Sequence, residues 1–203
     1  MGVLALLAAY VLGSTPTSYV AGRALKGIDL RSVGSGNLGA TNVYRTLGAP
    51  AAVVVLAVDM LKGFAPTWWF ASWFALGDSA WWPAALGVVS ILGHVRPYLG
   101  LFRGGGKGVA TASGVFMALS PLAFGIALSV FVLVVVLTRF VSLGSMLGAV
   151  TLAIASLALY GADSYRTWLG TAVAALVLWT HRANIGRLRR GEESRIGRPA
   201  VRA

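Results

Sequence analysis

Apolar residues dominate the chain in long runs, which charged residues, glycines and prolines separate. A helix needs roughly 20 residues to cross the hydrocarbon core of a bilayer, and most of the runs approach that length. The pattern therefore predicts an all-α, polytopic membrane protein with about seven transmembrane helices. We expect them at residues 3–22, 50–75, 82–100, 109–119, 122–138, 141–160 and 167–183.

The fourth run, residues 109–119, is only about half a span and is followed by Ser120-Pro121. It is either a short tilted helix or the first part of one broken helix that ends near residue 138. Basic residues favour seven spans, because this topology puts nearly all of them on one face, and a cytoplasmic face carries an excess of Lys and Arg. The N-terminus is then outside and the C-terminus is cytoplasmic. The cytoplasmic segments are 23–49, 101–108, 139–140 and 184–203.

The first run resembles a signal peptide in length, but no Lys or Arg precedes it. The first basic residues, Arg23 and Lys26, follow it, so we expect an uncleaved helix. We interpret residues 1–203 as a single integral membrane domain, with residues 194–203 as a basic tail.

Composition agrees with the membrane class. The chain is 57% apolar and 11% charged, with a mean hydropathy of +0.78, whereas about a quarter of residues in soluble domains carry charge. The absence of cysteine excludes disulfides and thiolate chemistry, and two histidines with six carboxylates leave little for a metal site. We expect neither a metal nor another cofactor. The net charge of +11 suits an anionic membrane surface better than nucleic acid, because the charges flank apolar spans.

Three polar clusters stand out on the cytoplasmic segments. Glycines let backbone N–H groups approach an anion, Ser, Thr and Asn add hydrogen bonds, and Arg45 and Lys107 add positive charge. We expect one shared site for a phosphorylated molecule. The clusters are Gly34-Ser35-Gly36-Asn37-Leu38-Gly39-Ala40-Thr41-Asn42 with Arg45, Gly104-Gly105-Gly106-Lys107-Gly108, and His181-Arg182-Ala183-Asn184-Ile185.

Each glycine cluster also has a simpler interpretation. Gly34 to Gly39 matches a dinucleotide-binding fingerprint, but that motif requires a preceding strand, and here an apolar helix precedes it. A flexible turn remains an alternative. Gly104 to Gly108 is not a Walker A motif, since Gly108 stands where Ser or Thr is required. It can still cradle a phosphate before a helix that begins near Val109, or it is a simple linker.

Two residue pairs have helical i, i+3 spacing. His181 and Asn184 would share a face of a continuing helix. Asp59 and Lys62 lie inside the second span, where a lone charge costs about 2.5 to 3.5 kcal/mol, so we expect them to pair, with substrate contact as the alternative. His94 is either a buried structural histidine or part of the pocket.

The chain resembles the PlsY family of bacterial acyl-phosphate-dependent glycerol-3-phosphate acyltransferases over its whole length. Two departures are three glycines before Lys107, where the usual pattern has two preceded by Lys or Arg, and a longer basic tail after Glu193. The resemblance is carried by the first cluster through Arg45, by Gly104 to Thr111 with His94 and Pro97 upstream, by His181 to Ile185 with Arg187 and Glu193, and by Leu61-Lys62-Gly63 and Val141-Ser142-Leu143-Gly144-Ser145.

The resemblance implies transfer of an acyl group from a long-chain acyl phosphate to the sn-1 hydroxyl of glycerol 3-phosphate. The products are lysophosphatidic acid and inorganic phosphate, and the expected place is the bacterial inner membrane, with lipid as a partner and no obligatory protein partner. The implied catalytic residues are Ser35, Arg45, Lys107, His181 and Asn184. The implied substrate-binding residues are Gly36, Asn37, Thr41, Asn42, Gly104, Gly105, Gly106, Gly108, Thr111 and Ser142, and the structural ones are Asp59, Lys62, His94 and Glu193.

The His-x4-Asp dyad of other acyltransferases is missing, since Leu99 follows His94 and Gly186 follows His181 at that spacing. A donor phosphate oxygen or His181 then takes the hydroxyl proton. An organic-phosphate transporter is the main alternative, although no internal repeat is evident. A scaffold protein would not need this collection of polar residues.

Overall fold

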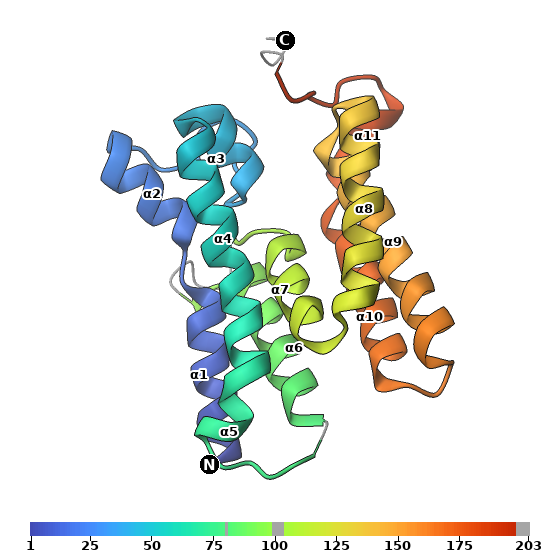
Figure 1. The fold of residues 1–203 in the computed structure, drawn as a ribbon. Helices are drawn as coiled ribbons and strands as arrows, with labels where there is room; N and C mark the ends of the chain where they lie inside the picture. The colour runs from blue at the N-terminus through green and yellow to red at the C-terminus, as the bar shows by residue number, and fades with distance from the viewer. Residues whose placement is uncertain (80, 99–103, 198–203) are drawn as a thin grey trace. The chain divides into compact units, whose positions relative to one another are not determined.

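The computed structural model describes residues 1–79, 81–98 and 104–197, and all regular secondary structure in these ranges is helical (Figure 1). Contacts divide the chain into two compact units, Met1–Leu119 and Ser120–Ala203. The single membrane domain expected from the sequence stays a prediction.

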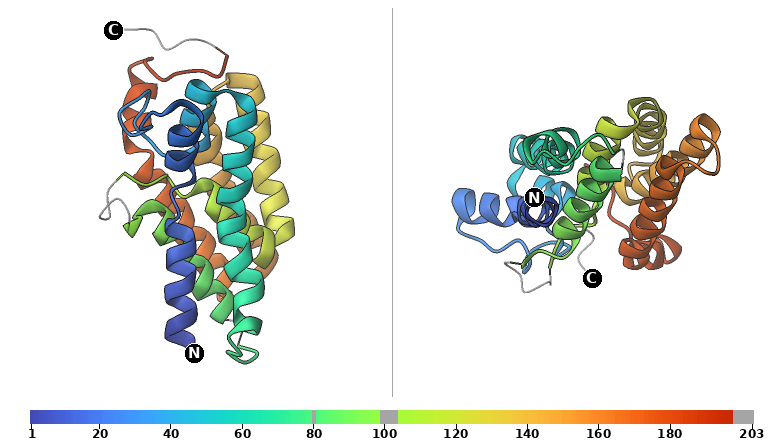
Figure 2. Two further views of the ribbon diagram at one scale, coloured as in Figure 1. Left: turned by 90° about the vertical axis from the view of Figure 1, so that its left-hand side faces the viewer. Right: turned by 90° about the horizontal axis from the view of Figure 1, so that it is seen from below.

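The first unit is built on two helix pairs, α1 with α6 and α4 with α7. These four helices run side by side, and α2 and α3 lie at the end away from the N-terminus (Figures 1 and 2). The elements are α1 (Gly2–Ser14), α2 (Thr17–Lys26), α3 (Ala40–Leu47), α4 (Ala49–Ala65), the π-helical turn η1 (Pro66–Phe70), α5 (Ala71–Trp73), α6 (Trp81–Val95) and α7 (Val109–Leu119).

The expected continuous helix at residues 3–22 is wrong in one respect, because it is broken between Ser14 and Thr17. Pro16 has no N–H to continue the helix, and a residue before proline avoids the helical region. Thr15 accordingly has φ −58° and ψ 118°. The break turns α2 away from α1 and exposes the Thr15 carbonyl to a side chain from α4.

Four helical stretches of the described residues are long and apolar enough to cross a membrane. Helices α6 and α7 are shorter apolar helices. Each predicted span contains a helix in its described part, although α6 ends at Val95 and the expected residues 99 and 100 lie outside the described ranges. The number of helices in the membrane stays a prediction. The four stretches are Gly2–Lys26, which includes the break, Ala49–Trp73, Pro121–Thr138 and Val141–Tyr160.

Glycines allow the helices of the first unit to pack closely. A Cβ atom on Gly13 of α1 would collide with the Ser90 carbonyl of α6, and one on Gly63 of α4 would collide with the Thr111 carbonyl of α7. Small residues let helix backbones approach in this way in membrane proteins. Ser90 and Thr111 lie near the end of α6 and the start of α7, so these contacts hold the two helices between which the second glycine cluster lies.

The second unit consists of α8 (Pro121–Thr138), α9 (Val141–Tyr160), α10 (Tyr165–Thr180) and α11 (Arg182–Arg189). Helices α8 and α10 both pack on α9. Arg139, with φ 64°, makes the tight turn from α8 to α9. The short helix α11 lies at the end of this unit where α9 begins (Figure 1).

Candidate active site

Asn42 organises the first glycine cluster. Its buried side chain accepts a hydrogen bond from the Ser35 N–H (3.1 Å) and donates to the carbonyls of Leu30 (3.2 Å) and Val33 (3.0 Å). Both amide hydrogens are therefore used within the loop. The side chain thus supports the loop, and the expected substrate-binding role of Asn42 stays a prediction.

Left-handed backbone bends the same loop at Gly34 (φ 64°) and Gly36 (φ 68°). A side chain is strained at such φ values, and a Cβ atom on Gly34 would also collide with Asn42 Oδ1. The loop is anchored from α2 by the Ser18 hydroxyl, which donates to the Leu38 carbonyl (3.0 Å). As a result Ser35 is held at an exposed position at the tip of the loop.

Helix α3 follows this loop directly. It begins at Ala40, so Thr41 lies in its first turn and Arg45 lies in its last turn, where the side chain is exposed. Four residues separate the two, which is about one helical turn, so they lie on one face of α3. The expected catalytic role of Arg45 beside the glycine loop stays a prediction.

The second glycine cluster packs against the end of α6. The Gly106 N–H donates to the His94 carbonyl (3.1 Å), and a Cβ atom on Gly106 would collide with the His94 ring. A Cβ atom on Gly105 would collide with the Val95 carbonyl. Only glycine fits at these two positions, so the glycines serve close packing as well as anion approach.

The two glycine clusters meet in the first unit. Asn37 Nδ2 donates to the Gly105 carbonyl over 3.4 Å, which is a long hydrogen bond. Gly108, with φ 83°, then turns the chain into α7 at Val109, and half-buried Lys107 stands immediately before that turn. The structure thus brings Asn37 and the Lys107 loop together. The third cluster belongs to the second unit, so the single site expected for all three clusters stays a prediction.

A buried ion pair lies beside the second loop. Lys62 Nζ is 2.6 Å from Asp59 Oδ1, and both side chains are 3% exposed. Lys62 also donates to the Thr15 carbonyl at the helix break (2.5 Å). His94 Nδ1 is 3.9 Å from the same Asp59 oxygen. The pairing expected from the i, i+3 spacing is present, and His94 is buried next to it.

These groups line a small, partly open hollow in the first unit. Among the described residues, the buried hydroxyls of Ser14 and Thr17 have no hydrogen-bond partner. Both can therefore bind a polar group that enters the hollow. The lining includes Ser14, Thr17, Lys62, His94, Gly105 and Gly106.

Thr111 is fully buried in α7 near Gly63 of α4. A contact between Thr111 and a substrate would require this packing to open. Its expected role as a binding residue therefore stays a prediction.

In the second unit, Glu193 collects the polar residues of the third cluster. Its carboxylate accepts hydrogen bonds from Ser142 of α9 (2.7 Å) and Asn184 of α11 (2.6 Å), and pairs with Arg187 Nε (2.7 Å). Burial alone would raise the pKa of Glu193, but these three hydrogen bonds and the Arg187 charge lower it below the ordinary value. The expected structural role of Glu193 fits this geometry, and the Ser142 hydroxyl is engaged in it.

His181 lies between α10 and α11 and is buried. Its Nδ1 is 2.8 Å from the Val177 carbonyl. A carbonyl can only accept, so Nδ1 carries the proton, and Nε2 is the nitrogen that can accept one in the neutral ring. This tautomer suits either a hydrogen-bonding role or a base role.

Comparisons with known proteins agree with this arrangement. A family model described as glycerol-3-phosphate acyltransferase matches residues 3–191. The chain belongs to the glycerol-3-phosphate acyltransferase family. The resemblance seen in the sequence and the predicted enzyme class, an acyltransferase, are thereby confirmed.

Curated relatives support the assignment over nearly the whole length. A glycerol-3-phosphate acyltransferase of Synechococcus elongatus is 46% identical over 94% of this chain and 92% of its own. One of Geobacter sulfurreducens is 43% identical over 93% of this chain and 94% of its own.

Solved structures of PlsY, an integral membrane glycerol 3-phosphate acyltransferase, are also similar. Its glycerol 3-phosphate form has a TM-score of 0.86 and 38% identity, and covers 97% of this chain and 96% of that one. Its lysophosphatidic acid form has a TM-score of 0.82 and 37% identity, and covers 97% of this chain and 95% of that one.

Sequence reasoning missed two features of this site. The unpartnered hydroxyls of Ser14 and Thr17 were not expected, although Pro16 between them signals a helix break. Asp29 and Arg31 also escaped attention, because an acid and a base two residues apart are common in exposed loops.

Proposed function

We propose that this enzyme transfers an acyl group from acyl phosphate to the sn-1 hydroxyl of glycerol 3-phosphate, and so forms lysophosphatidic acid and inorganic phosphate. The observation that carries the proposal is the junction of the two glycine loops in the first unit, with Lys107 beside it. The glycerol 3-phosphate and lysophosphatidic acid forms of the PlsY relative match the acceptor and the product.

Two phosphate groups have to come close in this reaction, one on each substrate. Their mutual repulsion is offset by fixed cations and N–H donors. Arg45 and Lys107 supply the charge, and the backbone of the glycine loops supplies donors. We assign the second loop, Gly104 to Gly108, to glycerol 3-phosphate, as the family resemblance implies.

In the proposed step, the acceptor hydroxyl oxygen forms a bond to the acyl carbonyl carbon. The bond between that carbon and the phosphate oxygen breaks, and phosphate leaves. Acyl phosphate is already activated, because its leaving group is phosphate. The protein therefore chiefly aligns the reactants and stabilises developing negative charge. The hydroxyl proton passes to a phosphate oxygen of the donor, and Nε2 of His181 is the competing acceptor.

Acylation assays test the proposal directly. Purified protein supplied with glycerol 3-phosphate and a long-chain acyl phosphate should form lysophosphatidic acid and release phosphate, and acyl-CoA should give little product. The donor choice rests on the missing His-x4-Asp dyad. Equal turnover with acyl-CoA would contradict the donor assignment. Accumulation of unchanged glycerol 3-phosphate in proteoliposomes, without acylation, would favour the transporter alternative.

We also propose seven spans in a bacterial inner membrane, with the N-terminus outside and the active site facing the cytoplasm. The basic residues of the connecting segments support this orientation. A topology reporter fused after Ala203 should report cytoplasm, and one fused after Asp78 should report the exterior. An external C-terminus would contradict the orientation.

A further inference from the structure

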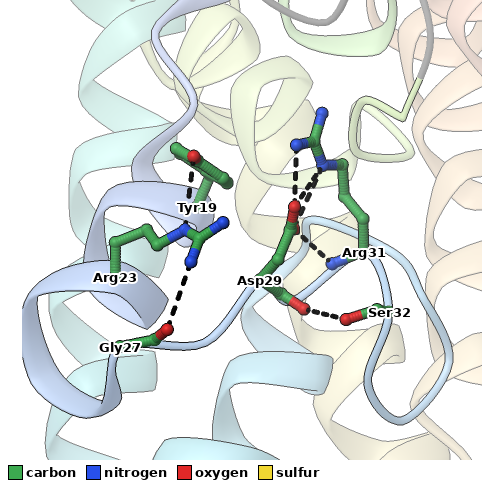
Figure 3. Close-up of polar contacts among 6 residues, drawn as sticks. All are labelled: Tyr19, Arg23, Gly27, Asp29, Arg31 and Ser32. Atoms are coloured by element: carbon green, nitrogen blue, oxygen red, sulfur yellow. Dashed lines mark hydrogen bonds and ion pairs between the residues drawn. The ribbon is translucent and has the colours of Figure 1, made fainter.

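Asp29 and Arg31 form an ion pair just before the first glycine cluster (Figure 3). The Asp29 carboxylate accepts hydrogen bonds from Arg31 Nη2 (2.7 Å) and Nε (3.0 Å), and also from the Arg31 backbone N–H (3.0 Å). A fork of this kind fixes the plane of the guanidinium as well as its distance. The direction of the Arg31 side chain is therefore set by its own loop.

The Arg31 side chain touches the second glycine loop. A Cβ atom on Gly104 would lie 3.1 Å from Arg31 Cδ and 3.7 Å from Cγ, so the aliphatic part of Arg31 runs along this glycine. The backbone of Arg31 contacts the first loop, because a Cβ atom on Gly36 would lie 3.0 Å from the Arg31 carbonyl. One residue thus contacts both loops.

Tyr19 of α2 completes the arrangement. The Arg31 guanidinium carbon lies 5.1 Å from the centre of the Tyr19 ring, within cation–π distance. The Arg23 guanidinium carbon lies 5.4 Å from the centre of the same ring, and Arg23 donates to Tyr19 Oη and to the Gly27 carbonyl. Arg23 and Arg31 therefore share one aromatic partner, but the hydrogen bonds of Arg23 hold the end of α2, whereas the Arg31 stem packs on Gly104.

We propose that Arg31, clamped by Asp29, is a positioning residue that sets the second glycine loop for glycerol 3-phosphate. This inference rests on the proposed function, because it assigns that substrate to the Gly104 loop. The hydrogen bonds from Arg31 lower the pKa of Asp29 to about 2, so the clamp stays ionised throughout the pH range of an assay.

Arg31→Met tests the proposal, because it keeps an unbranched stem and removes the fork. We expect the KM for glycerol 3-phosphate to rise about tenfold, since a displacement of about 1 Å can cost up to a hundredfold. The KM for acyl phosphate and the thermal midpoint in detergent should stay near the wild-type values. Asp29→Asn releases the guanidinium and should raise the KM for glycerol 3-phosphate by a similar factor. The KM of the double variant should be no higher than that of either single variant.

Arg23→Gln is the matched control, because it removes the same charge from the other guanidinium on Tyr19. It should leave both KM values unchanged. If the KM for glycerol 3-phosphate rose as much in the Arg23→Gln protein as in the Arg31→Met protein, the effect would be one of charge in general, and the proposal would be overturned. In the Arg31→Lys protein, the KM for glycerol 3-phosphate should lie between the wild-type and Arg31→Met values, because an ammonium cannot make the fork. A wild-type KM in this variant would also overturn the proposal.

Calorimetric binding of glycerol 3-phosphate separates this inference from the proposed reaction. If the wild-type protein binds glycerol 3-phosphate but acylates it with no donor, the proposed reaction fails. The inference then still predicts weaker binding by the Arg31→Met and Asp29→Asn proteins. Unchanged affinity in both, or a loss of thermal stability without any change in affinity, would overturn it.

Discussion

The Asp59–Lys62 pair makes a quantitative prediction about stability. Both side chains are 3% exposed, and the two charged atoms are 2.6 Å apart. Removing one partner of such a pair leaves a buried charge and typically costs about 3 to 5 kcal/mol, whereas replacing both partners by apolar residues is often close to neutral. Asp59→Leu should therefore be much less stable than Asp59→Leu/Lys62→Met.

The Thr15 carbonyl reduces the expected difference in stability between the single and the double variant, because it loses its Lys62 donor in the double variant. A net hydrogen bond is worth about 1 kcal/mol, so we expect the double variant to recover at least about 2 kcal/mol relative to the single one. At about 2 to 4 °C per kcal/mol for a chain of this size, that corresponds to roughly 4 to 8 °C in thermal midpoint.

Thermal unfolding in detergent, followed by tryptophan fluorescence, measures this difference. Glu192→Gln is the control, because its pair with Arg190 has a similar distance of 2.7 Å but side chains 53% and 61% exposed. An exposed pair contributes about 0 to 1 kcal/mol, so the midpoint should barely move. If the double variant lost as much free energy of unfolding as the two single variants lose together, the reasoning would be refuted.

Three further predictions concern the polar clusters. Lys107→Ala or Arg45→Ala should lower kcat/KM by about tenfold to a hundredfold while the protein still inserts, since each removes a charged hydrogen bond, and normal kinetics would contradict the assignment. His181→Gln should keep the shape of the pH–rate profile if a donor phosphate takes the proton. If the rate of the wild-type protein falls at acid pH and the rate of the variant does not, His181 is the base. Glu193→Gln should lower the thermal midpoint at neutral pH. Because the pKa of Glu193 is lowered by folding, this difference should shrink as pH falls below the ordinary value of 4.5, and a difference that grows there would contradict the sign.

Helices bounded by clear punctuation were predictable from the sequence. The expected ranges 109–119 and 141–160 coincide with α7 (Val109–Leu119) and α9 (Val141–Tyr160). Gly108 before α7 and Ser120-Pro121 after it break helices for local steric reasons. The break at Pro16 was missed although Ser14, Thr15, Thr17 and Ser18 flank it, because hydropathy averaged over a whole span does not register a lost backbone donor.

Residue types predicted the chemistry of the loops better than the role of each side chain. Asn42 has the amide expected of an anion-binding residue, but its hydrogen bonds close the loop around Ser35 and Val33. Which partner an amide finds depends on how the chain folds back over about ten residues. That geometry is decided by the left-handed turns at Gly34 and Gly36, and no periodic pattern encodes them.

Gly104 shows how one departure from a family pattern connects to a side chain far away in the sequence. The third glycine before Lys107 adopts φ 72°, which disfavours any side chain, and it faces the Arg31 stem at 3.1 Å. A longer loop has more conformations to lose when it is ordered. Under the proposal above, the Arg31 stem held by Asp29 restricts those conformations where it packs on Gly104. The additional glycine and the clamped arginine are thus two parts of one loop-positioning arrangement, and a change in either should be felt at Lys107.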